Sequence, residues 1–342
     1  MRKILLASLL AMPLAAVTAL DSAAHAQEQA PAATPLVLTL PAGARSLALG
    51  EAFVTVDEDD PDAIVHNPSL LASTDAVGIS VHRYGSSGTF AALNAASPLG
   101  PGTLGAAARF LDFHAIQVEP STGPGAGPVT VARALLFEGD AGPASSAAAT
   151  VGYGISFGDP DPTWLDDIRV GAAVHALRQA TPGSRGVGWA LDVGTAAELA
   201  DVMVSLAVQG LGPELELDGE AEPVPLPRRA VLTAAHESTP VGPFDLIAAA
   251  TVTAYDDVDA AGDGLDLALA PGIGLELAYW PIRGRTFFAR FGFRNDPYGV
   301  LEPLTLGAGF EADAFALDYA FENARGGLGA AHRIGLRWWG TD

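Results

Sequence analysis

The residues best suited to chemistry are acids, arginines and histidines spread along an otherwise apolar chain. One short turn is crowded with acids: Asp57, Glu58, Asp59, Asp60 and Asp62. Dense carboxylate oxygens suit a divalent cation, but the turn lacks the spaced ligands and central glycine of a calcium loop, and Pro61 interrupts it. We therefore expect a solvated turn, and we expect the same of the acidic stretch 214–222.

A second group of charges lies on late segments whose hydropathy alternates. The charges alternate with the main apolar residues, so the two sets occupy opposite faces of a strand. If Phe291 and Leu336 contact lipid, the charges face the interior, because an arginine on the lipid face costs roughly 2–4 kcal/mol at the midplane. The predicted interior set is Glu276, Arg290, Arg294, Glu311, Asp318, Glu322, Arg333 and Arg337. We expect an ion-pair network that stiffens the wall and anchors an internal segment; the alternative is a polar path or binding patch for a substrate.

Patterns that would indicate catalysis or metal binding are weak. The histidines are scattered, and none has the His-x-x-x-His spacing of a helical metal site. A hydrolase would need Ser, His and an acid brought together in space, and we predict no nucleophile elbow. Glycine-rich spots lie within predicted strands, where glycine relieves crowding. We therefore predict a non-enzymatic protein with no cofactor and no metal ion.

The composition narrows the class further. The 342 residues include 40 acids and 18 lysines and arginines, for a net charge of -22. So acidic a chain repels phosphate backbones, and we predict no nucleic-acid partner. Yet only 17% of residues are charged and the mean hydropathy is +0.28. After residue 26 no run of about 18 apolar residues occurs, which argues against transmembrane helices and favours strands with one lipid-facing side.

The first residues resemble an export signal. Arg2 and Lys3 precede the apolar run 4–19, and Ala24-His25-Ala26 gives a small-residue cleavage site. We expect residues 1–26 to be a cleaved signal peptide, residues 27–42 to be a flexible lead-in, and the protein to reach the outer membrane of a Gram-negative cell. The chain has no cysteine, so no disulfide supports it.

From residue 75 onward the hydropathy alternates with a period of two, as in Val151, Tyr153, Ile155 and Phe157. The even-numbered connections are short and most odd-numbered ones are longer, as in outer-membrane barrels. We predict an all-β, antiparallel up-and-down transmembrane barrel of about 14 strands over residues 75–342. The predicted strands are 76–83, 88–97, 103–112, 145–157, 167–178, 186–197, 202–211, 228–237, 244–256, 264–279, 285–294, 303–311, 315–323 and 330–340.

The stretch from Gly43 to Leu71 precedes these strands and fits neither a strand nor a helix. Glycines and prolines interrupt it, yet it is too apolar for a disordered tail. Such a segment needs a surface to pack against. We expect residues 43–74 to form a plug, or hatch, inside the barrel; a cap on a soluble sheet is the alternative.

The same stretch carries a family resemblance. The order Gly-Ala-Arg-Ser-Leu-Ala-Leu-Gly, Ala-Phe-Val-Thr-Val, an acidic turn and Asp-Ala-Ile-Val-His-Asn-Pro-Ser-Leu-Leu resembles the N-terminal signature of the PorV/PorQ family, outer-membrane barrels related to FadL transporters. His66 stands where that signature has an aromatic residue, and Glu51 where glycine is common. The stretch 208–213, Val-Gln-Gly-Leu-Gly-Pro, is a second match. The residues that the resemblance assigns to the gate are Gly43, Arg45, Gly50, Phe53, Asp59, Asp62, His66, Asn67 and Pro68.

The resemblance implies two functions, and a third is kept as a control. A PorV/PorQ-like barrel would be an accessory of type IX-like protein secretion, with secreted proteins or secretion-machinery subunits as partners. A FadL-like barrel would instead pass hydrophobic small molecules through the outer membrane, with 43–71 as the gate. The third hypothesis is a structural surface protein. In all three, outer-membrane lipid surrounds the barrel.

Overall fold

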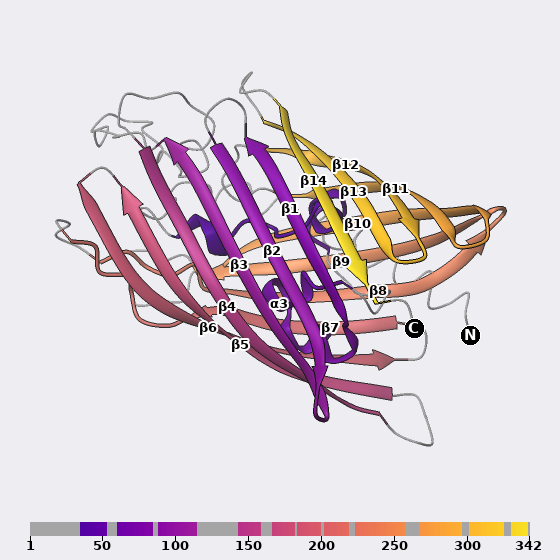
Figure 1. Ribbon diagram of the computed structural model, residues 1–342, viewed down its shortest axis with the longest axis horizontal. Coiled ribbons are helices and arrows are strands. Elements are labelled where there is room, and N and C mark those ends of the chain that lie inside the picture. Colours follow the sequence, from indigo (N-terminus) through magenta and orange to yellow (C-terminus); the bar gives the residue numbers. More distant parts are fainter. Residues whose placement is uncertain are drawn as a thin grey trace.

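Fourteen antiparallel strands form a closed barrel in the computed structural model (Figure 1). The structure describes residues 35–52, 60–84, 88–114, 143–158, 166–181, 183–199, 202–218, 223–256, 267–295, 301–324 and 330–340. Each strand pairs with its neighbour in sequence, and β1 pairs with β14 to close the ring. The strands are β1 (Ala76–Tyr84), β2 (Gly88–Leu99), β3 (Gly102–His114), β4 (Pro143–Phe157), β5 (Asp166–Thr181), β6 (Ser184–Leu199), β7 (Val202–Leu211), β8 (Arg229–Val241), β9 (Phe244–Asp256), β10 (Leu267–Ile282), β11 (Arg285–Arg294), β12 (Leu301–Ala312), β13 (Phe315–Ala324) and β14 (Ala330–Trp339). The predicted fold class and strand number are confirmed.

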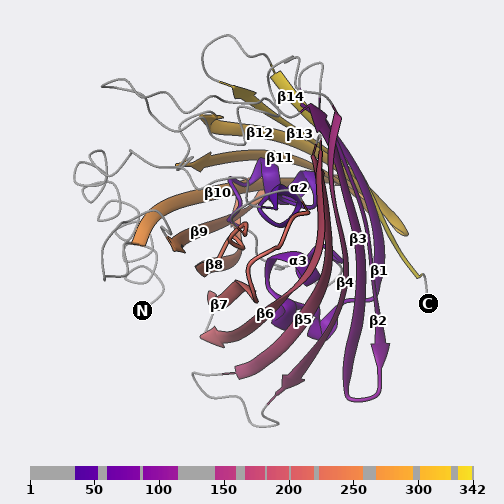
Figure 2. The same ribbon diagram turned by 90° about the vertical axis from the view of Figure 1, so that its left-hand side faces the viewer.

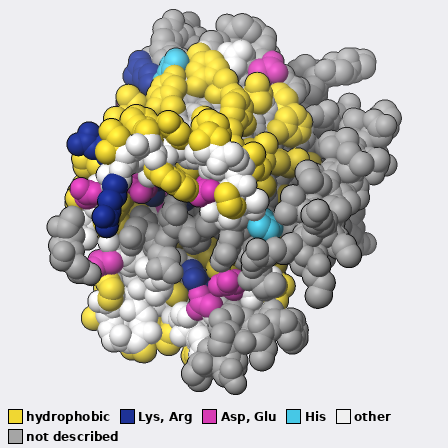
Figure 3. Space-filling model, turned by 90° about the vertical axis from the view of Figure 1, so that its right-hand side faces the viewer, with side chains coloured by type: hydrophobic (Ala, Val, Ile, Leu, Met, Phe, Trp, Pro, Cys, Tyr) yellow, Lys and Arg dark blue, Asp and Glu magenta, His cyan; other side chains and the backbone are white. Residues whose placement is uncertain are grey.

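Side chains alternate between the outer wall and the interior along each strand, as a period of two requires. On β14, Arg333 and Arg337 are buried, whereas Ile334 is 57% and Leu336 is 38% exposed. Figure 3 shows hydrophobic side chains gathered over a broad part of one face of the molecule. Exposed apolar residues on a closed barrel mark a surface that contacts lipid, while the charges lie inside.

Residues 35–52 and 60–74 lie inside the barrel. They contain the short helices η1 (Leu36–Leu38), α2 (Ala44–Ala48), α3 (Ala63–His66) and η2 (Pro68–Ser73). In Figure 2, α2 and α3 are enclosed between strands on both sides. We call residues 35–52 and 60–74 the inner segment. Among the described residues, no helix is both long and apolar enough to cross a membrane.

The inner segment begins before the predicted boundary at residue 43. Residues 27–42 are predicted to be a flexible lead-in, but Leu36, Val37 and Leu38 are buried in the main apolar cluster of the barrel. The sequence-based boundary is therefore wrong for residues 35–42, because an Ala/Pro-rich flank conceals three consecutive apolar residues. The predicted signal peptide, residues 1–26, and residues 27–34 lie outside the described residues.

The loop between β7 and β8 also enters the barrel. A bridge between Leu215 and Val224 folds it into a narrow hairpin, and the Asp218 N–H donates to the Arg185 carbonyl. Leu215 and Leu217 are buried, whereas the acids between and beside them are exposed. The prediction of solvated acids is therefore correct for the described residues 214–218, but the loop itself packs through its apolar residues.

The lipid-facing assignment predicts a depth-dependent cost for a charge. Ala172 lies midway along the outward, apolar residues of β5, so Ala172→Arg should destabilise the barrel by about 2–4 kcal/mol. Ser97→Arg, on the outer face at the short-turn end of β2, should cost about 0–1 kcal/mol. Urea unfolding in phospholipid vesicles would measure both free energies. Equal losses would contradict the assignment of the outer face.

Candidate functional site in the barrel lumen

Six buried charges form a closed ring between the inner segment and the barrel wall. Arg45 binds Glu276 through two hydrogen bonds of 3.1 and 3.2 Å, and its Nη1 lies 3.6 Å from Asp60. Arg290 joins Glu276 to Asp318, and Arg337 joins Asp318 at 3.1 Å to Asp60 at 3.5 Å. The members of this charge ring are Arg45, Asp60, Glu276, Arg290, Asp318 and Arg337. Three positive and three negative charges balance, which offsets the cost of burying each one.

Two further arginines attach the inner segment beside the charge ring. Arg294 pairs with Glu51 of the inner segment and with Glu322 of β13. Arg333 donates to the carbonyl oxygens of Pro41 and Gly43, and its Nε lies 3.0 Å from His82 Nδ1. The inner segment is therefore bound on this side through both its side chains and its backbone.

The structure thus brings together seven of the eight charges assigned to the interior by sequence. The eighth, Glu311, lies on the inward face of β12 but is only half-buried, further along the strand than Thr305. The sequence missed Asp60, which closes the charge ring. Asp60 and Asp62 are buried, so the prediction of a solvated turn is wrong for both residues. They are buried because the turn reaches arginines that come from the far end of the chain.

The opposite side of the inner segment rests on glycines of the wall. Gly154, Gly171 and Gly194 lie on the inward faces of β4, β5 and β6 and form what we call the glycine seat. A Cβ atom added at Gly171 would overlap the backbone of Pro68, and one added at Gly194 would overlap the side chain of Asn67. The missing side chains therefore let the backbone of η2 lie directly on the sheet.

The Asn-Pro motif starts η2 at this seat. Asn67 is the N-cap, and its side-chain oxygen accepts a hydrogen bond of 3.0 Å from the Ser69 N–H. Pro68 follows at the first position of the helix, where its missing N–H costs nothing. The Asn67 amide also donates, at 3.4 Å, to the carbonyls of Thr195 and Leu206. One residue therefore both shapes the helix and fixes it to the wall.

A second polar chain crosses the lumen under η2, and the sequence analysis missed it. His175 Nε2 lies 2.8 Å from Asp192, and the other carboxylate oxygen of Asp192 accepts 2.8 Å from the Gly210 N–H. Gln209 donates to the Val65 and His66 carbonyls and accepts 2.7 Å from Arg229. The inward parity of these residues on their strands is the sequence signal that could have identified them.

Gly210 belongs to the second PorV/PorQ-like motif, the stretch 208–213, and its backbone conformation requires a glycine. Its φ of +72° is a left-handed conformation, and an added Cβ would overlap the Pro227 carbonyl. The pairing of β6 with β7 shifts register between Leu191 and Val193 at this level. The end of β7 therefore bends inward, which directs the following loop into the barrel.

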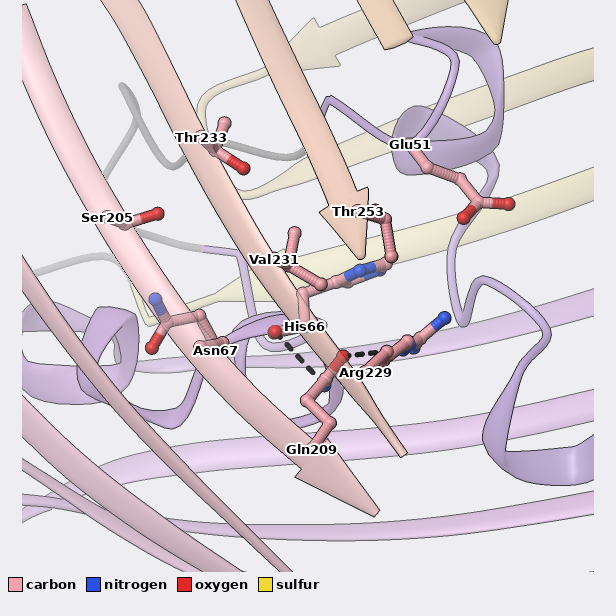
Figure 4. A pocket seen from close by; sticks show the side chains of 10 residues that line it. Glu51, His66, Asn67, Ser205, Gln209, Arg229, Val231, Thr233 and Thr253 are labelled. Atoms are coloured by element: carbon pink, nitrogen blue, oxygen red, sulfur yellow. Dashed lines mark hydrogen bonds between the residues drawn. The ribbon is translucent and has the colours of Figure 1, made fainter. Parts of the chain in front are cut away.

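A small polar cavity separates the inner segment from the wall at β7, β8 and β9 (Figure 4). Its volume is about 30 Å³, enough for roughly two water molecules. Ser205, Thr233 and Thr253 line the wall side, and Glu51 and His66 line the inner side. Burial, with a contribution from Arg229, lowers the pKa of His66 to about 3, so its ring is neutral. The wall thus contributes hydroxyls and short side chains together with Gln209 and Arg229, and the inner segment contributes polar side chains.

Three of the gate residues assigned by resemblance remain to be placed: Gly50, Phe53 and Asp59. Gly50 has a φ of +62° and lies against the backbone of Phe293, where a Cβ would not fit. Phe53 and Asp59 lie outside the described residues. One Gly-x-Ser-x-Gly match does exist, at Gly154–Gly158, but it lies at the end of β4 and its Ser156 donates to Asp167. It is a strand segment rather than a nucleophile elbow.

The structure is similar to those of several solved outer-membrane channels. The CymD monoaromatic hydrocarbon channel matches with a TM-score of 0.54 and 13% identity over 91% of this chain and 100% of that one. The Pseudomonas putida toluene transporter TodX and a Pseudomonas aeruginosa FadL homologue have TM-scores of 0.48 and 0.46, both at 11% identity over 86% of this chain and 96% of theirs. No family model matches the sequence, and no curated protein matches it. The likeness to CymD shows a shared fold.

The glycine seat predicts a steric cost for one added methyl group. Gly171→Ala should destabilise the protein by about 1–3 kcal/mol and expose the inner segment to protease, because the new Cβ meets the Pro68 backbone. Gly158→Ala is the matched control, since nothing lies near its Cβ position. Urea unfolding and limited proteolysis would compare the two. Similar protection in both variants would show that η2 does not rest on Gly171.

Asp62 predicts a pH dependence. Burial, followed by the nearby charge of Asp60, raises its pKa from 3.8 to about 7. The fold therefore favours the protonated carboxyl: this stabilisation is complete below about pH 3.8 and is lost as the pH rises to about 7. Asp62→Asn, which cannot ionise, should gain stability relative to the parent protein as the pH rises through that window.

Urea midpoints for the parent protein and Asp62→Asn, measured at about pH 4 and about pH 8, would test this dependence. Asp218→Asn, at an exposed position in the β7–β8 loop, is the control and should show no comparable change. A relative gain for Asp62→Asn on acidification would reverse the sign and refute the argument.

Proposed function

We propose that this protein is an outer-membrane channel that passes small hydrophobic molecules, with the inner segment as its gate. The proposal is supported by the fold shared with CymD and by the way the inner segment is attached. α2 packs on β11–β14, and η2 packs on β3–β6. The cavity lies on a third side, at β7–β9. This uneven attachment is the observation that carries the proposal: at β7–β9 the inner segment is held by a few hydrogen bonds around the cavity, and we propose this side as the passage.

The inner wall near the long loops favours a hydrophobic permeant. Phe90, Leu111 and Phe113 are buried there, and they belong to the same apolar cluster as Leu36 and Val37 of η1. Apolar surface that faces a barrel lumen is unfavourable in water and favourable against an apolar molecule. Because η1 covers this surface, a permeant would contact it in place of η1 once the inner segment moves aside.

A second candidate function is a role as an accessory of protein secretion. It is supported by the two PorV/PorQ-like motifs, whose residues hold the inner segment and turn the β7–β8 loop inward. Such a barrel would act by binding proteins at its loops. Deletion would then reduce surface proteins and leave the uptake of small molecules unchanged.

Narrowing the passage tests the first proposal. Thr233 lines the cavity, so Thr233→Trp should lower uptake of a labelled monoaromatic hydrocarbon several-fold in cells that depend on this protein. Leu232→Trp is the matched control, since Leu232 faces lipid on the same strand. Heat-modifiable migration on gels would verify that both variants fold. Unchanged uptake by a folded Thr233→Trp barrel would rule out this passage, and loss of surface proteins instead would favour the secretion role.

A further inference from the structure

Two arginines project from the outer wall at the loop end of β5 and β6. Arg178 is paired in register with Val187, and Arg185 with Ala180. The two arginines are therefore diagonal neighbours on one face, about 7–8 Å apart. Both are exposed, and only residues 182 and 183 separate the two strands. Their own connection is thus too short to cover them.

The position of the two arginines along the barrel axis follows from the apolar residues that lie next to them on the outer face. The outward residues of β5 are apolar from Ile168 to Ala176, eight residue steps or about 26 Å along the strand at roughly 3.3 Å per residue. Arg178 is the next outward residue. On β6, Val187 is 76% and Trp189 is 52% exposed. The two guanidinium groups therefore lie where the apolar belt ends, at the level of lipid headgroups.

These arginines differ from those inside the barrel. The charge-ring arginines all bind carboxylates, whereas no ion pair or side-chain hydrogen bond joins Arg178 or Arg185 to another described residue. Two adjacent like charges repel each other, and an anion between them would reverse that repulsion.

We propose that Arg178 and Arg185 bind the phosphate groups of lipid A, the glycolipid of the outer leaflet, while Val187 and Trp189 contact its acyl chains. One guanidinium group can donate two parallel hydrogen bonds to two oxygens of the same phosphate. The ammonium group of a lysine cannot form this paired contact. The long loops place this end of the barrel at the outer leaflet. The site is separate from the lumen, so it does not depend on what the channel passes.

Native mass spectrometry of the full-length protein in detergent would test the site with lipid A and with dephosphorylated lipid A as probes. The parent protein should bind lipid A roughly thirty-fold more tightly than the dephosphorylated form, given two arginines near an anionic headgroup. The double variant Arg178→Gln/Arg185→Gln should lose that difference. Arg285→Gln, an outward arginine at the opposite end of the barrel, should keep it.

Three results would overturn the proposal. Equal lipid A binding by the parent protein and the folded double variant would exclude the two arginines. If the parent protein bound dephosphorylated lipid A as tightly as lipid A, the phosphate groups would be excluded as the ligand. Equally tight binding of phosphatidylglycerol would show a site for any anionic lipid instead of the outer-leaflet glycolipid. Heat-modifiable gel migration would confirm that the double variant folds, which is expected because both side chains are exposed.

Discussion

The matching of opposite charges in the charge ring is the constraint on which the placement of the inner segment depends. Each buried ion costs several kcal/mol in lost hydration, and an unmatched partner costs more than the pair contributes. The charge ring meets this constraint only when the inner segment is in place, because Arg45 and Asp60 come from it and the other four members come from the wall. Barrel closure and docking of the inner segment are therefore coupled: without the segment, Glu276 would lose Arg45, and Arg337 would lose Asp60.

The two halves of the inner segment are held by different physical means. Around α2 the attachment is ionic and depends on side chains that reach across the lumen. Around η2 it is steric, because the glycine seat lets backbone lie on backbone and Asn67 donates to wall carbonyls. Ionic contacts respond to pH and to neighbouring charge, whereas close packing does not. The part of the segment around Asp62 is accordingly the more responsive one.

The third side of the lumen differs from the sides that hold α2 and η2. At β7–β9 the wall presents hydroxyls, short side chains, Gln209 and Arg229 toward a small cavity, and the loop after Gly210 turns inward beside it. A channel that passes small molecules needs one side of its lumen to be less tightly filled than the rest. The chemical difference among the three sides of the lumen is therefore the structural basis of the proposed passage. The outer wall shows a separate difference, between the apolar belt and the two arginines at its edge.

The sequence alone determined the barrel, its strands and the facing of most residues, because a period of two combined with lipid outside leaves each strand one stable orientation. It also located Arg45, Asn67 and Pro68 in a segment that needs a surface. Only the tertiary structure decided which charges meet. Arg45 and Glu276 are 231 residues apart, and Asp60 joins the ring although its acidic neighbours predict a solvated turn. Such pairs depend on closure and register across many strands, which no local pattern encodes, and so do Asp192 with His175 and the glycine seat with η2.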